Sequence, residues 1–247
     1  MITTAIIIAR MTSNRLPGKV MMPLADKPTL QWCIERCRKA KYVDQVVVAT
    51  VDSIDSKPIF DLCDKLKTEC IGGDEHDVLK RVYDVATKIK TDNIIEITAD
   101  CPLIDPNQID LCCYTLLSNK YYIDVDYVSN IEIRWLPDGF DVQVYTYNCL
   151  SRLNNLVKDT RFHVGTNIFK YKKNFLISYM IPDVNFKYPS WRLTLDTIED
   201  YQVLSKIFNH FKNEKSFYIK DIIKYVHENK YLLDINKGIR TKNFEEG

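Results

Sequence analysis

The chain contains 247 residues, of which 46% are hydrophobic, so it can bury one large core. Its 34 lysines and arginines nearly balance 33 aspartates and glutamates, and a net charge of +1 excludes a general attraction to nucleic acid or to an anionic membrane. Because no apolar run approaches about 18 residues and no signal peptide is recognisable, we expect a cytoplasmic protein without membrane spans. The eight cysteines include no CxxC pair, so we expect reduced thiols rather than a zinc site.

In the first half of the chain, short apolar runs alternate with segments whose apolar residues recur at helical spacing. The runs predict buried strands at 4–9, 44–51, 68–73 and 93–99. The spaced segments predict helices at 28–40, 55–66, 77–89 and 105–117. This alternation indicates βαβ units and therefore an α/β fold, a doubly wound and mostly parallel sheet with helices on both faces. In such sheets, ligands bind beyond the carboxyl ends of the strands.

The second half of the chain is less regular. Strands are expected at 126–130, 139–147 and 175–181. Helices are expected at 150–157, 160–169 and 218–229. Segment 191–211 is predicted to begin as a strand and to continue as a helix capped near Asp196 or Thr197. No linker rich in glycine, proline or serine divides the chain, so a single domain is expected over residues 1–247.

A group of cations directly follows the first predicted strand. The segment IIIARMTSNRLPGKVM, residues 6–21, contains Arg10, Arg15 and Lys19 but no acid. Arginine forks and a lysine point charge suit phosphate oxygens, and Pro17-Gly18 allows a tight chain reversal close to a ligand. A solvated basic loop explains the same pattern equally well. The spacings GxxxxGK[ST] and GxGxxG are absent, so neither a P-loop nor a dinucleotide site is predicted.

Two aspartates stand at the ends of predicted strands. Asp100 follows the strand at 93–99, and Asp196 ends a short strand just ahead of a helix. Carboxylates at such positions suit Mg²⁺, although a turn for Asp100 and a helix cap for Asp196 explain each residue taken alone. Cations for a triphosphate and carboxylates for Mg²⁺ together indicate nucleotidyl transfer in which pyrophosphate leaves.

Three further residues are candidates for binding an acceptor molecule. Strand alternation places Arg192 on the same face as Asp196, where its guanidinium can bind a carboxylate of the acceptor. Trp135 precedes the loop LPDGFD and can line a sugar pocket, and His163 is a candidate for the same site. Core packing of Trp135 and a backbone hydrogen bond of His163 remain open as alternatives.

Several motifs, in order along the chain, resemble the cytidylyltransferases that make CMP-activated acidic sugars. These include the acylneuraminate and 3-deoxy-manno-octulosonate enzymes, and the branch named for spore-coat polysaccharide biosynthesis is the most similar. The motifs are ARMTSNRLPGKVMMPLADKP (9–28), GGDEHDVLKRVYDVA (72–86), ITADCPLIDPNQID (97–110), LPDGFDVQVYT (136–146), RFHVGTNIF (161–169) and WRLTLDTIEDY (191–201).

The resemblance implies a nucleotide-diphospho-sugar transferase-like fold with a projecting hairpin region that forms a homodimer. It implies a nucleotide-binding half at about 1–130, an acceptor and dimerisation region at about 131–190, and a metal strand with carboxyl-terminal helices at about 191–235. The implied reaction transfers CMP from CTP to an anionic sugar, releases pyrophosphate and serves polysaccharide or glycoconjugate synthesis. Another nucleotide, a sugar-phosphate or phosphonate acceptor, and a non-catalytic nucleotide-binding subunit remain open as alternatives.

Residue by residue, the resemblance assigns roles to positions in this sequence. The implied nucleotide-binding residues are Ala9, Arg10, Met11, Arg15, Lys19, Asp77, Arg81 and Asp100. The implied catalytic residues are Arg10, Lys19, Asp100 and Asp196, of which the two aspartates would hold the cofactor Mg²⁺. The chain departs from the pattern at Thr12, where this branch usually has glycine, and at Phe162 and Gly165, where glutamate and threonine are expected. The last two departures change the expected acceptor site.

Overall fold

The computed structural model describes residues 1–119, 123–159 and 161–240. Thr160, the first residue of the predicted helix at 160–169, and the carboxyl-terminal residues of the predicted domain, 241–247, lie outside these ranges.

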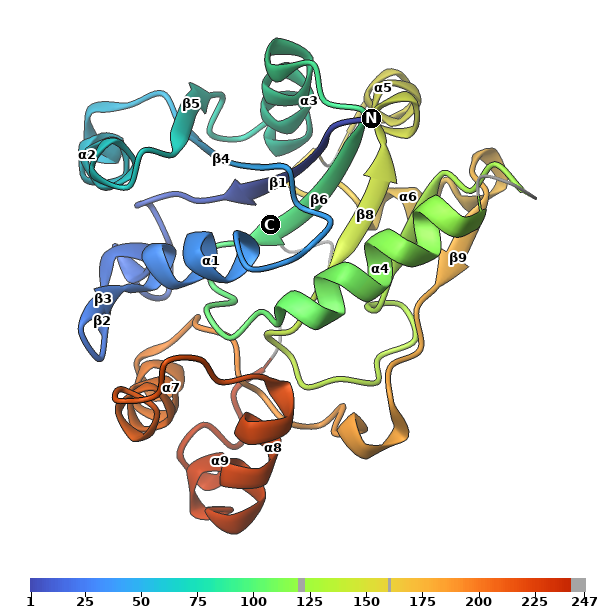
Figure 1. Cartoon of the computed structure of the whole chain (residues 1–247). Helices are drawn as coiled ribbons and strands as arrows, with labels where there is room; N and C mark the ends of the chain where they lie inside the picture. The colour runs from blue at the N-terminus through green and yellow to red at the C-terminus, as the bar shows by residue number, and fades with distance from the viewer. Residues whose placement is uncertain (120–122, 160, 241–247) are drawn as a thin grey trace.

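One seven-stranded sheet forms the centre of the protein (Figure 1). The strands are, in order across the sheet, β5 (Glu69–Gly73), β4 (Gln45–Val51), β1 (Thr3–Ile8), β6 (Asn93–Thr98), β8 (Gln143–Thr146), β7 (Tyr127–Ser129) and β9 (Ile177–Tyr179). Strands β5, β4, β1 and β6 are mutually parallel, whereas β8 runs antiparallel to both β6 and β7. The predicted α/β class and its mostly parallel sheet are therefore confirmed.

Helices cover both faces of the sheet because successive strand residues point to opposite sides. On one face, apolar side chains pack under α1 (Thr29–Cys37), α2 (Lys57–Lys65) and α4 (Pro106–Asn119). On the other face, they pack under α3 (Val78–Ile89), α5 (Tyr147–Leu156) and α6 (Thr166–Lys170). Within β1, Ala5 and Ile7 belong to the first layer and Ile6 to the second. The strand therefore needs the uninterrupted apolar run from which it was predicted.

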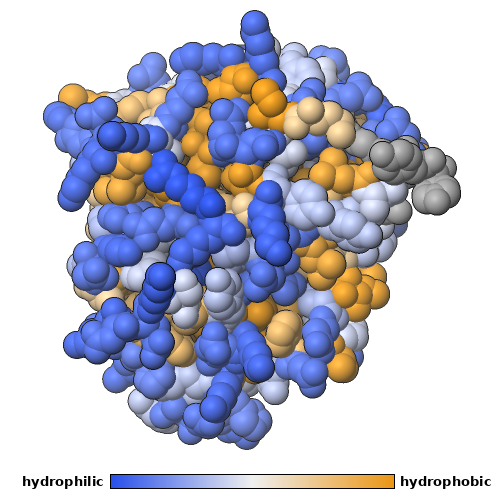
Figure 2. All heavy atoms as spheres, in the orientation of Figure 1, coloured by the Kyte–Doolittle hydropathy of each residue, from blue (hydrophilic) through white to orange (hydrophobic). Residues whose placement is uncertain are grey.

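A third apolar cluster lies beyond the sheet. It is formed by α7 (Ile198–His210), α8 (Ile219–Glu228) and α9 (Tyr231–Ile235), which pack together at one end of the molecule (Figure 1). Short 3-10 helices occupy Lys19–Met21, Ile54–Ser56, Lys172–Asn174 and Val184–Phe186. The face of Figure 1 carries mainly hydrophilic side chains, with smaller apolar areas between them (Figure 2). Among the described residues, no helix has the length and apolar character needed to cross a bilayer.

The strand predicted at the start of segment 191–211 does not form. Only one isolated bridge, between Asp138 and Arg192, has the geometry of strand pairing there. The segment instead bonds to two loops, through Leu193 N–H to the Asp138 carbonyl (2.8 Å) and Leu195 N–H to the Asp100 carbonyl (2.9 Å). Gly139 makes this approach possible, because its φ is +108° and a Cβ at this position would lie 2.4 Å from the Leu193 oxygen.

The region for which a projecting hairpin is expected contributes strands to the main sheet. Residues 131–190 supply β8 and the edge strand β9. Within the described ranges, the separate two-stranded sheet lies early in the chain and pairs β2 (Pro23–Leu24) with β3 (Lys27–Pro28). This small sheet directly follows the basic loop and leads into α1.

Candidate active site

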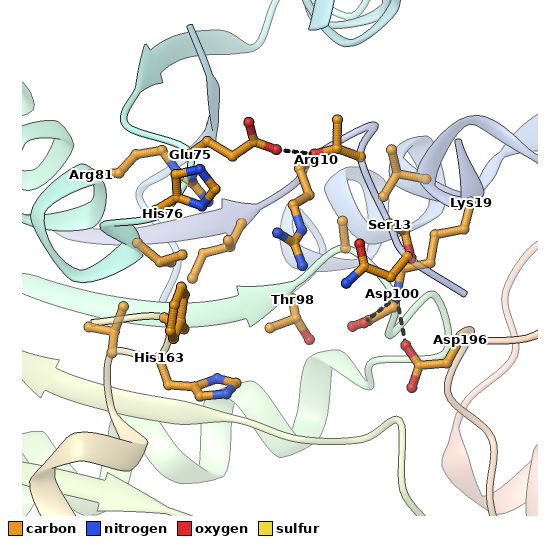
Figure 3. Close-up of a pocket in the computed structure, with 18 of the residues that line it drawn as sticks. Arg10, Ser13, Lys19, Glu75, His76, Arg81, Thr98, Asp100, His163 and Asp196 are labelled. Atoms are coloured by element: carbon orange, nitrogen blue, oxygen red, sulfur yellow. Dashed lines mark hydrogen bonds and ion pairs between the residues drawn. The ribbon is translucent and has the colours of Figure 1, made fainter. Parts of the chain in front are cut away.

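A cleft of about 470 Å³ opens at the carboxyl ends of β1 and β6. Its lining side chains come from the loop after β1, from both sides of the α3 start, from β6, and from the segments around 163 and 196. They are Ile8, Arg10, Thr12, Ser13, Asn14, Arg15, Lys19, Val20, Glu75, His76, Val78, Arg81, Glu96, Thr98, Ala99, Asp100, Phe162, His163, Val164 and Asp196. Figure 3 shows Lys19, Asp100 and Asp196 together at one end, and Glu75, His76 and Arg81 at another. Arg10 lies between these ends with its guanidinium pointing into the cleft (Figure 3).

The basic loop keeps its shape through one backbone carbonyl. The carbonyl oxygen of Met11 accepts from the N–H groups of Ser13 (3.0 Å) and Gly18 (2.8 Å), which folds the loop back on itself. Gly18 adopts a φ of +71°, a left-handed conformation that favours glycine. Ala9 is buried and its N–H bonds to Ala49 of the neighbouring strand (3.1 Å). Ala9 and Met11 therefore shape the loop and do not themselves line the cleft.

Four charged side chains of the cleft form a compact ion cluster, consisting of Arg15, Lys19, Asp100 and Asp196. The Lys19 ammonium donates to Asp100 Oδ2 and to Asp196 Oδ1, each at 2.7 Å. The Arg15 guanidinium lies 2.9 Å from Asp196 Oδ2. The cations that have no acid within their own loop are thus paired with the two aspartates expected to bind metal.

The partners in this cluster determine its ionisation. Burial favours the neutral acid at Asp196, but the charge of Lys19, followed by those of Arg15 and Arg192, lowers its pKa to about 2. Burial likewise lowers the pKa of Lys19, yet the charges of Asp100 and Asp196 outweigh it and raise the pKa. Lys19 and Asp196 therefore stay charged at neutral pH.

The side chain of Asp196 can join the ion cluster because another residue caps the helix that follows. Thr197 is the N-cap of α7 and forms a capping box with Asp200, whose carboxylate accepts the Thr197 N–H at 3.1 Å. The same carboxylate accepts the Asp196 N–H at 3.0 Å. The backbone of Asp196 is therefore held by Asp200 while its side chain points into the cleft.

Arg192 has a supporting position and does not line the cleft. Its guanidinium donates to Asp200 (2.9 and 3.0 Å), to Asp196 (2.8 Å) and to Asp138 (3.2 Å). With only 8% of its surface exposed, Arg192 is committed to these three carboxylates. The geometry thus makes it a positioning residue for Asp196 and gives no support to the predicted contact with an acceptor carboxylate.

Two other predicted binding residues also point away from the cleft. Asp77 is the N-cap of α3, accepting from the Lys80 N–H (2.8 Å), and its other oxygen binds the Arg161 guanidinium (2.7 Å). It therefore ties the segment before His163 to α3. Trp135 donates its indole N–H to the Asp183 carbonyl (3.2 Å), and the Lys187 ammonium lies over its ring.

The buried Arg81 offers unused hydrogen-bond donors to the cleft. It is 1% exposed, and its Nη1 donates to the Asp74 carbonyl at 2.5 Å. Its Nε and Nη2 have no hydrogen-bond partner in the described part of the chain. Burial, followed by the charge of Arg10, lowers its pKa to about 10. Buried donors without partners favour a ligand with acceptor atoms.

Sequence reasoning missed Glu96 and Thr98, which both line the cleft from β6. The strand was correctly predicted as buried, but a glutamate inside the apolar run NIIEIT was the signal of a functional position. Thr12, a departure from the expected pattern, donates its hydroxyl to Glu75 Oε1 (2.5 Å) and joins the basic loop to the segment before α3.

The described residues fit a Mg²⁺ ion that shares its coordination with a substrate. No group of three or more His, Cys, Asp or Glu side chains suited to a metal occurs within the described ranges, so a cage made entirely of protein ligands is absent there. Mg²⁺ typically uses one or two carboxylates, substrate phosphates and water. Asp100 and Asp196 meet this requirement, and the Lys19 ammonium between them marks a position that favours positive charge.

A basic loop and paired aspartates at the carboxyl edge of a doubly wound sheet define this protein as a nucleotidyltransferase. The profile of the cytidylyltransferase family matches residues 4–239, and the chain belongs to this family. It is therefore a CTP-dependent nucleotidyltransferase, as expected from the sequence.

Similar proteins come from both archaea and bacteria. The chain is 33% identical over 243 residues to an uncharacterized protein of Methanocaldococcus jannaschii, covering 98% of this chain and 97% of the relative. It is 30% identical over 210 residues to a spore coat polysaccharide biosynthesis protein of Bacillus subtilis, covering 82% and 85%. Identity to the 3-deoxy-manno-octulosonate cytidylyltransferase of Geobacter sulfurreducens is 35% over 116 residues, covering 47% and 46%.

Solved structures agree with this placement. A cytidylyltransferase from Leptospira borgpetersenii serovar Hardjo-bovis has a TM-score of 0.89 at 28% identity, covering 98% of this chain and 100% of that chain. A CMP:2-keto-3-deoxy-manno-octonic acid synthetase complexed with CTP shares the fold, with a TM-score of 0.65 at 16% identity over 85% and 99% of the two chains.

Proposed function

We propose that this cytidylyltransferase transfers CMP from CTP to a sugar acid and releases pyrophosphate, for the synthesis of a surface polysaccharide or glycoconjugate. The observation that carries the proposal is the ion cluster, in which the Lys19 ammonium lies 2.7 Å from both Asp100 and Asp196 beside the basic loop. The names of the Bacillus and Geobacter relatives support the polysaccharide role and the sugar-acid acceptor.

In this mechanism, the basic loop binds the part of CTP that leaves. Arg10, Arg15 and Lys19 bind the β- and γ-phosphate oxygens, so Lys19 exchanges a carboxylate partner for phosphate. Asp100 and Asp196 hold Mg²⁺, which neutralises phosphate charge when bound. Nε and Nη2 of Arg81, which have no partner among the described residues, donate hydrogen bonds to oxygen or nitrogen atoms of the nucleotide.

The transfer step needs positioning and charge more than a dedicated base. An acceptor hydroxyl oxygen attacks the α-phosphorus, so one P–O bond forms while the bond to the pyrophosphate oxygen breaks. The hydroxyl proton leaves to water, and pyrophosphate carries away the bonding electrons. The cations of the basic loop stabilise the charge that develops on pyrophosphate.

The test is pyrophosphate release from each of the four NTPs, with Mg²⁺ and a panel of sugar acids, sugar phosphates and phosphonates. We expect release with CTP and a sugar acid, at least about 1,000-fold above that of Asp100→Asn. The exposed pair of Lys57 and Asp61 provides a matched control, and Asp61→Asn should keep full activity. Release with a sugar phosphate and with no sugar acid would overturn the acceptor assignment.

A homodimer is part of this proposal, because the family resemblance implies one. Light scattering coupled to size exclusion measures the mass directly. A mass of one chain at micromolar concentration would remove the dimer from the proposal without affecting the reaction.

A further inference from the structure

Glu96 is a buried carboxyl at the wall of the cleft, in the middle of the central strand β6. Its neighbours Ile95 and Ile97 face the layer under α1 and α4, so Glu96 faces the opposite layer together with Ile94 and Thr98. It is 5% exposed and lines the cleft. Thr98, which follows on the same strand face, points into the cleft in Figure 3.

Neutral donors hold this carboxyl in place. The Tyr145 hydroxyl (3.0 Å) and the Gly165 N–H (2.9 Å) both donate to Glu96 Oε2. Gln143 is its partner in the register of β8, and the side chain of Gln143 also bonds to it. Tyr127 in turn donates to Gln143 Oε1 at 2.6 Å, which fixes the amide. We call Glu96, Gln143, Tyr145 and Gly165 the Glu96 cluster.

Within the described part of the chain, no lysine or arginine forms an ion pair with Glu96. Burial raises its pKa to about 7 against the effect of the three neutral donors. Buried carboxylates are ordinarily paired with a positive charge. Arg10, Arg15, Lys19 and Arg81 also line the cleft, but none of these four described cations forms an ion pair with Glu96.

Gly165 shows that the cluster is built for this carboxyl. A Cβ at position 165 would lie 2.2 Å from Gln143 Oε1 and 3.1 Å from Glu96 Oε2. The threonine expected here from the family resemblance cannot fit while Gln143 and Glu96 keep their positions. The departure at Gly165 thus leaves the space that the Gln143 amide and the Glu96 carboxyl occupy.

The position of Glu96 separates it from the phosphate chemistry. Asp100 is four positions after Glu96, so their Cα atoms are at most roughly 13 Å apart. That separation is comparable with the length of a sugar acid whose attacking hydroxyl lies near the ion cluster. A ligand group that reaches Glu96 is therefore part of the acceptor.

We propose that Glu96 determines acceptor specificity by binding an amino group, so that the preferred substrate is an amino-substituted sugar acid. This inference rests on the proposed function, because it assigns one substituent of the acceptor in that reaction. An ammonium supplies the positive charge that the Glu96 cluster lacks and forms a charge-assisted hydrogen bond.

The experiment compares acceptors that differ by one group. The probes are 3-deoxy-manno-octulosonate and analogues in which one hydroxyl at a time is replaced by an amino group. Calorimetry at pH 8 measures their binding to the wild-type protein and to Glu96→Gln, and pyrophosphate release with CTP is followed in parallel. We expect at least one amino analogue to bind about 10- to 100-fold more tightly than the parent, and Glu96→Gln to abolish this preference.

The controls separate specificity from folding and from the reaction itself. Asp105→Asn alters another buried carboxyl that lies outside the cleft, so it should keep the amino preference. Glu96→Gln should leave the affinity for CTP within about twofold of wild type, because its effect is on acceptor binding. If Glu96→Gln fails to fold, Glu96→Asp serves instead, since the retracted carboxylate should weaken the preference.

Three results would overturn the inference. Either no amino analogue binds more tightly than the parent, or the preference persists in the Glu96 variant. If no probe binds at all, the inference is also wrong. Pyrophosphate release from unsubstituted sugar acids is independent of these readings, so the proposed function can stand while the role of Glu96 falls.

Discussion

The ion cluster and the Glu96 cluster, which both lie on the cleft, shift the pKa of a buried carboxyl in opposite directions. At the ion cluster, the pKa of Asp196 falls to about 2 because burial is outweighed by Lys19, Arg15 and Arg192. At the Glu96 cluster, the pKa of Glu96 rises to about 7 because burial meets only neutral donors. The two acids lie on the same cleft, so partners rather than depth decide their charge. In the ion cluster, cations of the protein pair with the carboxylates. In the Glu96 cluster, the described partners are neutral, and a ligand can supply the cation.

The largest expected effect comes from removing a carboxylate of the ion cluster. Asp196→Asn should reduce turnover at least about 1,000-fold, because the variant loses a carboxylate that orients Lys19 and that we propose holds Mg²⁺. The fold should survive, since Arg192 keeps Asp138 and Asp200 as partners. Pyrophosphate release gives the rate, and circular dichroism gives the fold. Activity near that of Asp61→Asn would remove Asp196 from the mechanism.

The pH dependence of the unfolding free energy has opposite signs for the contributions of Glu96 and Asp196. Glu96 has a raised pKa, so the native state keeps the proton that the unfolded chain loses, and stability falls from pH 4.5 to about 7. The loss is roughly 3 kcal/mol at most. Asp196 has a lowered pKa, so its stabilisation is present above pH 3.8 and is lost as the pH falls toward 2.

Urea denaturation from pH 2 to pH 8 measures both contributions. Glu96→Gln should flatten the fall between pH 4.5 and 7 and leave the acid limb unchanged. Tyr127 and Tyr145, which face Glu96, have pKa values raised well above the ordinary tyrosine value and do not titrate in this range. An unchanged slope in Glu96→Gln would contradict the charge assigned to Glu96.

Overfilling the Glu96 cluster should have a moderate effect. Gly165→Thr places a Cβ in contact with the Gln143 amide and should cost about 1–3 kcal/mol of unfolding free energy. The same substitution in a Gln143→Ala background should cost less, because the obstructing oxygen is gone. Thermal denaturation of the four proteins completes the cycle. Equal costs in both backgrounds would separate Gly165 from Gln143.

The smallest effect is expected at the mouth of the cleft. Thr12→Val removes the hydroxyl that binds Glu75, but this contact is exposed. The unfolding free energy should therefore change by less than about 0.5 kcal/mol. The KM for CTP should rise by no more than about threefold, as measured by pyrophosphate release. A larger rise in KM would make the Thr12–Glu75 contact part of nucleotide binding.

The parallel half of the fold was predictable because its strands are buried on both faces. Runs such as Thr3–Ile8 must be apolar throughout, and their alternation with helices then fixes the α/β class. The segment before Asp196 was predicted as a strand and is not one. Its partners are two loops, and the glycine that lets them approach lies more than fifty residues earlier. No local pattern contains that information.

Candidate site residues were likewise predictable where the signal is local in the sequence, and not where it depends on distant contacts. Arg10, Arg15 and Lys19 were identified because cations without acids are visible in one loop, and the structure places all three in the cleft. The role of Arg192 depends on Asp138, 54 positions away, and on the cap of α7. Glu96 was overlooked because the apolar run around it was interpreted only as core.

Asn236 sets a practical limit to any shortening of the chain. Its side-chain amide donates to the Arg192 carbonyl (3.0 Å) and to Asp200 Oδ1 (2.9 Å), although it follows the last helix. Asp200 holds both the backbone of Asp196 and the guanidinium of Arg192. Truncation before residue 236 would therefore expose to water the residues that hold Asp196, the proposed catalytic aspartate. A protein trimmed for crystallisation or fused at its carboxyl end should retain Asn236.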